Sequence, residues 1–364
     1  MKKMKFLALT FLLVFMSCSE ELVNSVESQI AEPQSQSENE IKTSLSGKLI
    51  NTPSLPNATS TISGTILTFT QTGKIGTADG SLWNPTLVIP ANSPLTEIKI
   101  NANVTLYGNI VIKKTNFIVT GDNRDNSIID GSRTPYTKGD RSLCSIRHDG
   151  NGTISISKLQ SRNPANFHLT GFSNATISEV KIIENRETHS TDGFHFAKGA
   201  IVDQAFIDTY DDVLYVGEVT KISNSTIYHN KNGAIFMVSW GQKVSDIGTG
   251  ITEAINCTFI DNYVGTDNYA HGIVGWSQKK NEGAELAKVK FTNCIWKANP
   301  SKPVKRSPFY TFGRISGENP DAIIKDGTIE QIGGNCAWTN PSNIRYGIGV
   351  VPADSQIIKP STCP

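Results

Sequence analysis

Residues 174–185 read NATISEVKIIEN, and their pattern decides the fold. Apolar residues alternate with polar ones, a polar corner follows, and a second short apolar run closes on Asn. The pattern recurs at residues 199–209, 220–230, 251–262 and 289–299. The spacing is 24 positions from Ile183 to Ile207 and 21 from Ile207 to Tyr228. Repeats of this length build solenoids, and short strands without helices between them predict a right-handed parallel β-helix.

The rest of the chain agrees with an all-β fold. Asn, Gly, Ser, Thr, Ile and Val are abundant, while helical periodicity is scarce. Alternating segments also precede the clearest repeats, at residues 98–107, 117–121 and 127–131. A two-sheet sandwich is the alternative, but sandwiches do not usually repeat in this way. We therefore expect a single parallel β-helix of about ten coils across residues 58–364.

The N-terminus has the features of a targeting segment. Lys2, Lys3 and Lys5 precede an apolar run, residues 6–16, that is too short to span a bilayer. The run leads to Cys18, and the pattern resembles a bacterial lipoprotein signal in which Cys18 is lipidated. An ordinary signal peptide cut nearby is the alternative. Residues 1–17 are predicted to be removed, which leaves an outer-membrane lipoprotein at the cell surface or facing the periplasm.

Residues 18–57 are predicted to be a disordered tether. They are rich in Glu, Gln, Ser and Asn and contain few aromatic residues. Such a segment buries too little apolar area to offset the entropy of ordering it. The protein is therefore expected to contact the membrane only through its lipid anchor, and to be a monomer.

The net charge and the cysteine content indicate which binding partners the protein can have. The formal net charge of +1 gives no indication of nucleic acid binding, and a neutral polymer is the easier substrate to imagine. Cys257, Cys294 and Cys336 each follow an Asn, so stacking of equivalent positions predicts inward core cysteines. No cysteine or histidine spacing typical of a zinc site is present, and no metal or cofactor is predicted. Cys363 is a candidate to pair with Cys336.

Three aspartates are candidates for catalysis: Asp192 in a Thr-Asp-Gly, and the adjacent pair Asp211 and Asp212. A coil of 20–25 residues places Asp192 and Asp211 on neighbouring coils. Hydrogen-bonded strands lie about 4.7–4.9 Å apart, so the carboxylates are expected to gather on one patch. Clustered carboxylates repel, which raises at least one pKa and lets an acid and a base coexist. Both members of the pair can face outward only at a corner or bulge.

Residues 191–241 carry a resemblance to a known family. Thr191-Asp192-Gly193, Asp211-Asp212-Val213-Leu214, the Asn-Lys-Asn-Gly of residues 230–233 and the Ser-Trp-Gly of residues 239–241 resemble glycoside hydrolase family 49. That family contains dextranases and isopullulanase, inverting enzymes built on a right-handed parallel β-helix. Its members usually carry an N-terminal β-sandwich, for which this chain leaves little room.

The resemblance implies a role for each aspartate. Asp211 is the expected general acid, and Asp192 and Asp212 are expected to hold and deprotonate the attacking water. Inversion generally places acid and base about 6.5–9.5 Å apart, with room for water between them. The expected reaction is hydrolysis of a polysaccharide, with an α-glucan such as dextran as the first choice. Turn capping by the aspartates is the alternative, because Asp before Gly is common in turns.

Other residues are candidates for substrate binding. The sugar ring is expected to stack on Trp240, with Tyr215 as another aromatic candidate. His195 and His229 are candidates to hydrogen-bond substrate or an aspartate, and Lys231 is a candidate to line the groove. Each of these side chains has a structural alternative, in the core or on the solvated surface.

Three other functions remain open. Polygalacturonases share the Thr-Asp-Gly and the aspartate pair, but their His-Gly lies about one coil later, whereas His271 lies 60 positions after Asp211. A β-helix lyase would bind calcium through the aspartates beside a basic residue, which the sequence does not place convincingly. A surface β-helix that binds glycan without cleaving it is the non-enzymatic alternative.

Overall fold

The computed structural model describes residues 55–79, 82–137, 140–185, 191–230, 233–238, 250–262, 270–276, 287–301, 310–312, 328–334, 344–346 and 356–358. Within them the chain is almost entirely β, with one short 3-10 helix, η1 (Arg141–Leu143). None of the described residues forms a helix with the length and apolar character needed to cross a membrane. The predicted signal peptide with Cys18, and nearly all of the predicted tether, lie outside these residues and stay predictions.

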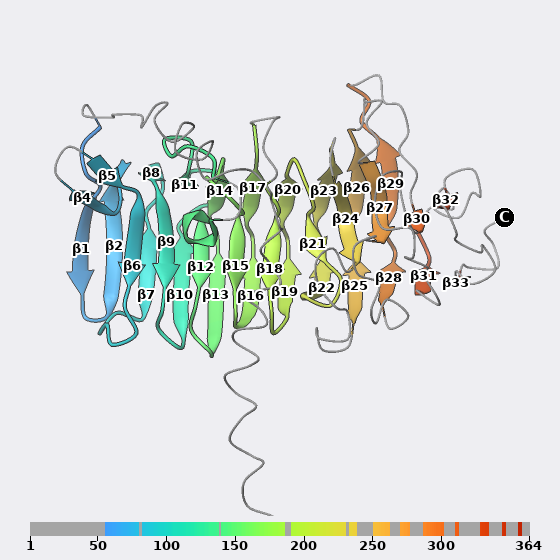
Figure 1. Ribbon diagram of the computed structural model, residues 1–364, viewed down its shortest axis with the longest axis horizontal. Coiled ribbons are helices and arrows are strands. Elements are labelled where there is room, and N and C mark those ends of the chain that lie inside the picture. The colour runs from blue at the N-terminus through green and yellow to red at the C-terminus, as the bar shows by residue number, and fades with distance from the viewer. Residues whose placement is uncertain are drawn as a thin grey trace, which may run out of the picture.

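Three long sheets wind around a common axis, so the predicted parallel β-helix is confirmed (Figure 1). Successive strands of a coil join the twelve-, nine- and ten-stranded sheets in turn, and within each sheet neighbours come from successive coils. The pairs are parallel, with the exception of β1 with β2 and β4 with β5. Connections between parallel strands take the right-handed direction almost without exception, which is the hand expected here.

The twelve-stranded sheet contains, in spatial order, β1 (Thr59–Ser63), β2 (Ile66–Gln71), β7 (Glu97–Ile100), β10 (Phe117–Gly121), β13 (Thr153–Ser157), β16 (Asn174–Ser178), β19 (Ala200–Asp203), β22 (Val219–Ser223), β25 (Ile251–Ile255), β28 (Lys288–Thr292), β31 (Thr328–Ile332) and β33 (Gln356–Ile358). The nine-stranded sheet contains β3 (Gly73–Lys74), β8 (Val104–Tyr107), β11 (Ser127–Asp130), β14 (Gln160–Arg162), β17 (Lys181–Ile183), β20 (Phe206–Asp208), β23 (Thr226–His229), β26 (Thr258–Asp261) and β29 (Ile295–Ala298).

The ten-stranded sheet contains β6 (Thr86–Ile89), β9 (Asn109–Ile112), β12 (Ile146–His148), β15 (Leu169–Gly171), β18 (Phe194–Phe196), β21 (Leu214–Tyr215), β24 (Gly233–Val238), β27 (Ala270–Trp276), β30 (Tyr310–Phe312) and β32 (Ile344–Tyr346). The hairpin β4 (Thr77–Asp79) and β5 (Leu82–Asn84) stands apart from the three sheets. Strand β1 pairs antiparallel with β2 and closes the N-terminal end of the twelve-stranded sheet.

A sharp corner joins the twelve-stranded sheet to the nine-stranded sheet in most coils. Its turning residue has positive φ, between 51° and 63°, which is uncommon for residues other than Gly, Asn and Asp. The residues at this corner are Asn103, Lys158, Glu179, Gln204, Asn224, Asn256 and Asn293. The side chains also stack, because Asn256 Nδ2 donates to Asn224 Oδ1 at 3.3 Å. The Asn found in several repeats is therefore a turn residue.

The residue after this corner faces inward. Cys257 and Cys294 occupy that position on adjacent coils and are 1% exposed, which confirms the prediction of core cysteines. Both are free thiols, whereas Cys336 and Cys363 lie outside the described residues. Between the sheets the interior is filled by aliphatic residues and by a T-shaped cluster of Phe236, Phe259 and Phe291 with ring centroids 5.3–5.8 Å apart.

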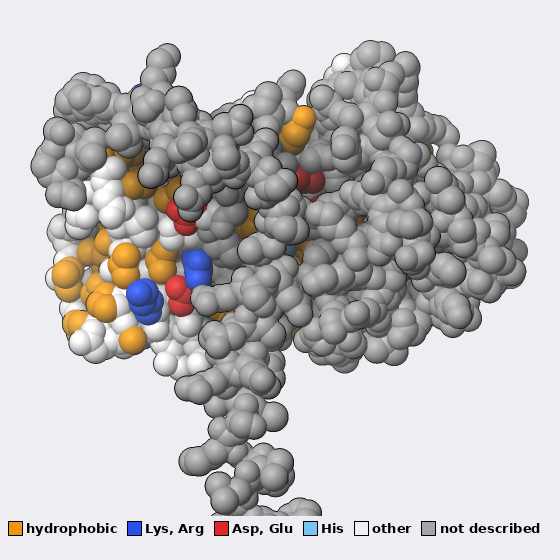
Figure 2. Space-filling view, in the orientation of Figure 1, with side chains coloured by type: hydrophobic (Ala, Val, Ile, Leu, Met, Phe, Trp, Pro, Cys, Tyr) orange, Lys and Arg blue, Asp and Glu red, His pale blue; other side chains and the backbone are white. Residues whose placement is uncertain are grey.

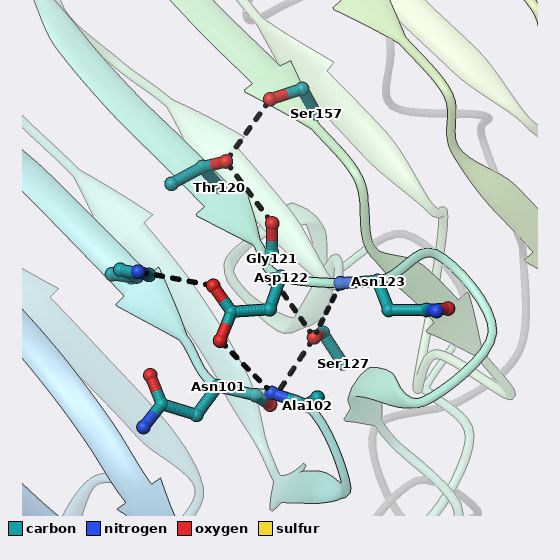
Figure 3. Close-up of polar contacts among 9 residues, drawn as sticks. Asn101, Ala102, Thr120, Gly121, Asp122, Asn123, Ser127 and Ser157 are labelled. Atoms are coloured by element: carbon teal, nitrogen blue, oxygen red, sulfur yellow. Dashed lines mark hydrogen bonds and ion pairs between the residues drawn. The ribbon is translucent and has the colours of Figure 1, made fainter.

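The corner between β10 and β11 is longer and is held by side chains (Figure 3). Ser127 Oγ accepts hydrogen bonds from the backbone N–H groups of Asp122 and Asn123 at 3.1 and 3.2 Å, and donates to Asn101 O. The Asp122 carboxylate accepts from Ala102 N on the preceding coil at 3.3 Å. These contacts satisfy backbone groups that the turn leaves without a ladder partner.

The surface over the N-terminal coils mixes side-chain types. Figure 2 shows hydrophobic side chains there, with a few Lys or Arg and Asp or Glu side chains beside them. This mixture agrees with the near-neutral net charge of the chain.

Candidate active site

The three predicted aspartates lie together at one corner of the β-helix, where the chain enters the ten-stranded sheet. Asp192 stands two residues before β18, and Asp212 stands two residues before β21. Phe194 pairs with Leu214, and Gly193 N donates to Asp212 O at 2.9 Å. This register places Asp192 beside Asp212 on the next coil, with Asp211 one residue earlier.

The corner that the adjacent pair requires is present. Tyr210 and Asp211 form a bend ahead of β21, so strand alternation does not apply to the pair. Asn230 on the next coil holds this bend, because its Nδ2 donates to Asp208 Oδ1 at 2.7 Å and to Thr209 O at 2.5 Å. The Thr209 hydroxyl in turn donates to Asp211 O at 3.2 Å. The first Asn of the Asn-Lys-Asn-Gly motif therefore fixes the backbone that presents Asp211.

The aspartates are close enough to share one small molecule. One carboxylate oxygen from each of Asp192, Asp211 and Asp212 lies within 4.8 Å of the other two. A central point is then no more than about 2.8 Å from each oxygen (4.8/√3), which is the length of a hydrogen bond between oxygens. A water molecule at that point has only two protons to donate, so its third contact requires a protonated carboxyl group.

Asp212 is the member of the cluster most clearly suited to keep that proton. Burial raises the pKa of Asp212 well above its usual range, and the nearby charges of Asp211 and Asp192 raise it further. Hydrogen bonds from Ala234 N at 2.6 Å and from the Tyr215 hydroxyl at 3.1 Å oppose this rise and hold the carboxyl group. The pKa of Tyr215 is also raised well above its usual range, first by burial, so its hydroxyl stays a donor.

The three aspartates differ in exposure. Asp192 and Asp212 are buried, at 6% and 5% exposed, whereas Asp211 is partly exposed. Only Asp211 is thus positioned to touch a large substrate directly, while the other two can act on a water molecule between them and the substrate.

Gly233, the last residue of the Asn-Lys-Asn-Gly motif, packs directly against the cluster. Its φ is +64°, and a methyl group at this position would lie 2.5 Å from Asp211 Oδ1 and overlap Asp212 Oδ1. The carboxylates occupy the space that any side chain here would need. The motif therefore requires glycine for its backbone conformation and for its lack of a side chain.

His195 is buried between two carboxylates. Its Nε2 lies 2.8 Å from Asp192 Oδ2, and its Nδ1 lies 3.1 Å from Glu218 Oε2. Burial alone would lower the pKa of His195, but the charges and hydrogen bonds of Glu218 and Asp192 raise it to about 9. His195 is therefore an imidazolium near neutral pH, and it contacts an aspartate, which is one of its two predicted roles.

Aromatic rings enclose the His195 imidazole. The ring of Phe167 lies 4.9 Å from it and the ring of Tyr215 lies 4.5 Å from it, centroid to centroid. Tyr215 is 4% exposed, and its contacts are with His195 and Asp212. Tyr215 thus lies in the predicted site, but its buried ring packs against His195 and does not present a face on which a sugar could stack. It connects the histidine to the aspartate cluster instead.

Glu218 and Phe167 belong to this group but were not predicted from the sequence. Glu218 follows β21 in a turn in which its N–H donates to Tyr215 O at 3.1 Å. Residues 213–219 are otherwise apolar apart from Gly217 and Tyr215, so an acid there was a detectable signal. Phe167 comes from the preceding coil, and no local pattern connects it with the site.

Of the other predicted binding residues, the structure describes His229. His229 lies two residues after the buried Ile227 on β23 and therefore faces the interior. Its Nδ1 lies 3.7 Å from Asp261 Oδ1 and its Nε2 lies 3.5 Å from Gly233 O, so it contacts an aspartate, although not one of the three predicted ones. This position results from strand alternation, which the spacing of the motifs did not reveal. Trp240 and Lys231 lie outside the described residues and stay predictions.

The cluster also offers three oxygens to a divalent cation. Calcium generally takes six to eight oxygen ligands, however, and among the described residues only these three carboxylates form such a group. Three carboxyl groups at this spacing can hold a water molecule and one retained proton without any additional ligand. A chelator experiment separates the two uses of the cluster.

Comparison with known proteins adds no family assignment. No family model matches the sequence, and a search of the curated proteins finds no match. The likeness to glycoside hydrolase family 49 thus rests on the motifs within residues 191–241.

Proposed function

We propose that the protein is an inverting glycoside hydrolase that acts on a neutral polysaccharide, with an α-glucan such as dextran as the first candidate. The observation that carries the proposal is the meeting of Asp192, Asp211 and Asp212 at one corner, two buried and one partly exposed. The motif resemblance supplies the sugar class, and the cluster geometry supplies the chemistry.

Burial suggests how the work is divided. Asp211 is the proposed general acid, because it alone among the three is exposed enough to reach a glycosidic oxygen, and the proton that it delivers is the one retained between Asp211 and Asp212. Asp192 and Asp212 hold the attacking water, and Asp192 removes its proton as the water adds to the anomeric carbon. In an inverting reaction the acid gives up one proton and the base gains one, so the cluster as a whole conserves its protons.

One observation favours a retaining hydrolase as the second candidate. The nearest oxygens lie within 4.8 Å of one another, close to the spacing of about 5–5.5 Å between carboxyl groups in retaining enzymes. Retention, however, needs both an acid and a nucleophile in contact with the sugar. Two of the three aspartates are buried, so inversion through a bound water is the better account.

Charge favours a neutral sugar. The described contacts at this corner join five acidic side chains, Asp192, Asp208, Asp211, Asp212 and Glu218, and the imidazolium of His195. The only cation among them already contacts two carboxylates. An acidic polysaccharide such as polygalacturonate would therefore meet repulsion at this corner.

Incubation with a panel of glycans tests the proposal. We expect new reducing ends from a neutral α-glucan, unchanged by a chelator, and none from polygalacturonate. Asp192→Asn should lose this activity, while Asp203→Asn on the outer face of the twelve-stranded sheet should keep it. Unsaturated products that depend on a divalent cation would indicate a lyase. Binding without cleavage would leave a glycan-binding protein.

A further inference from the structure

His195 is held at both ring nitrogens by oxygens that, when ionised, can only accept hydrogen bonds. Asp192 Oδ2 faces Nε2 at 2.8 Å, and Glu218 Oε2 faces Nδ1 at 3.1 Å. A neutral imidazole has one N–H, so one of these contacts would set a lone pair against a carboxylate. With both carboxylates ionised, both contacts are hydrogen bonds only when both nitrogens carry protons.

Among the contacts described, Glu218 reaches the aspartate cluster through His195. It lies in the turn between β21 and β22, is 2% exposed, and contacts the side of the imidazole remote from the aspartates. A carboxylate so buried requires a charged partner, and His195 is the partner that the structure gives it.

We propose that Glu218 is a positioning residue that, through a doubly protonated His195, holds the Asp192 carboxylate in place for attack by water. The inference rests on the proposed function, because it assigns Asp192 to the water. It extends that function by adding a residue outside the aspartate cluster. Glu218 sets the charge of the histidine, and the histidine sets the orientation of Asp192.

The surroundings of the ring explain why its orientation is fixed. Phe167 and Tyr215 lie against it at 4.9 and 4.5 Å. The ring therefore has little freedom to turn away from Asp192 when a contact is lost. The titratable groups that face it are Glu218, Asp192 and Tyr215, and the hydroxyl of Tyr215 is bonded to Asp212.

Glu218→Gln is the decisive variant, because it keeps the shape of the side chain and removes its charge. The histidine then keeps one proton, and its ion pair with the Asp192 carboxylate becomes a hydrogen bond from a neutral donor, which holds the carboxylate less firmly. We expect kcat to fall by about tenfold or more and KM to stay the same, since the lost interaction acts on the chemical step. Glu253→Gln, on the outer face of the twelve-stranded sheet, is the matched control.

Nitrogen NMR of the His195 imidazole provides a measurement that does not depend on activity. Near neutral pH the wild-type ring should show two protonated nitrogens, and the Glu218→Gln ring should show one. A singly protonated wild-type ring would overturn the inference even if the variant failed to fold. Equal kcat in Glu218→Gln and Glu253→Gln would overturn it while leaving the hydrolase intact. A wild-type protein without glycan cleavage would remove the proposed function and with it the catalytic role, and the NMR arm would still decide the Glu218–His195 contact.

Discussion

Replacing Gly233 by alanine perturbs the aspartate cluster without replacing any ionisable residue. The new methyl group would lie 2.5 Å from Asp211 Oδ1, and ordinary contact begins near 3.4 Å. The carboxylate must therefore move by about 1 Å, or the strand must. A misplacement of about 1 Å in reacting groups can lower a rate by about 100-fold.

The cost in stability has two parts that a second glycine separates. Gly64, in the turn between β1 and β2, has a φ of +59° against +64° for Gly233, and a methyl group there would meet nothing within 4 Å. Gly64→Ala should cost about 1 kcal/mol, the left-handed penalty less the entropy lost by the unfolded chain. Gly233→Ala should cost about 2–4 kcal/mol, because crowding against the aspartates adds about 1–3 kcal/mol.

Two measurements are made on each variant. Urea unfolding gives the free energy of unfolding, and the rate of hydrolysis is measured on the glycan that the wild type cleaves. We expect Gly64→Ala to keep full activity and Gly233→Ala to lose about 100-fold. If the two variants are equally stable and equally active, the carboxylates do not pack against Gly233, and the described geometry of the cluster is wrong.

Further predictions concern the chemistry and the anchor. Asp211→Asn should abolish cleavage of natural polymer but retain hydrolysis of a glycosyl fluoride, which needs little protonation, whereas Asp192→Asn and Asp212→Asn should lose both; equal loss in all three would exclude Asp211 as the acid. NMR of the first anomer released should show inversion, and retention would favour the second candidate. Since the pKa of His195 is raised from 6.5 to about 9, its contribution to stability is complete below pH 6.5 and disappears as pH rises through 9. The free energy of unfolding should therefore fall by up to about 3 kcal/mol over that interval, and His195→Asn should remove the dependence. Mass spectrometry of the mature protein should find a lipidated Cys18 at the N-terminus, and an unmodified N-terminus elsewhere would contradict the anchor.

The fold was readable from the sequence because each coil repeats the same physical requirements. Inward apolar residues recur with strand alternation, and Asn recurs where the backbone needs positive φ, as at Asn256 and Asn293. The inward position of Cys257 and Cys294 followed directly from stacking of those repeats. The coiled arrangement of parallel strands could thus be predicted from local patterns in the sequence.

The candidate site was only partly readable. The aspartates could be brought together because coil length places Asp192 near the pair, although the register sets it beside Asp212, with Asp211 one residue away. The contacts of His195 with Phe167 and Glu218 join residues from neighbouring coils through side-chain direction, which spacing does not determine. The same limit explains His229, whose inward direction depends on where β23 begins.

The corner between the twelve-stranded and nine-stranded sheets has a constant length over the later coils, which limits where the sequence can accept insertions. From β13 to β29, two residues always separate the twelve-stranded sheet from the nine-stranded one. The connection into the ten-stranded sheet, where the aspartates lie, varies from one residue before β9 to fifteen before β12. An insertion at the constant corner would shift every later side chain of that coil to the wrong face. One at the variable corner leaves the stack unaltered. The constant corner therefore specifies the architecture, whereas the connection ahead of the ten-stranded sheet can change in length and sequence. Grafting new segments into that connection is the route by which the selectivity of the protein can be redesigned.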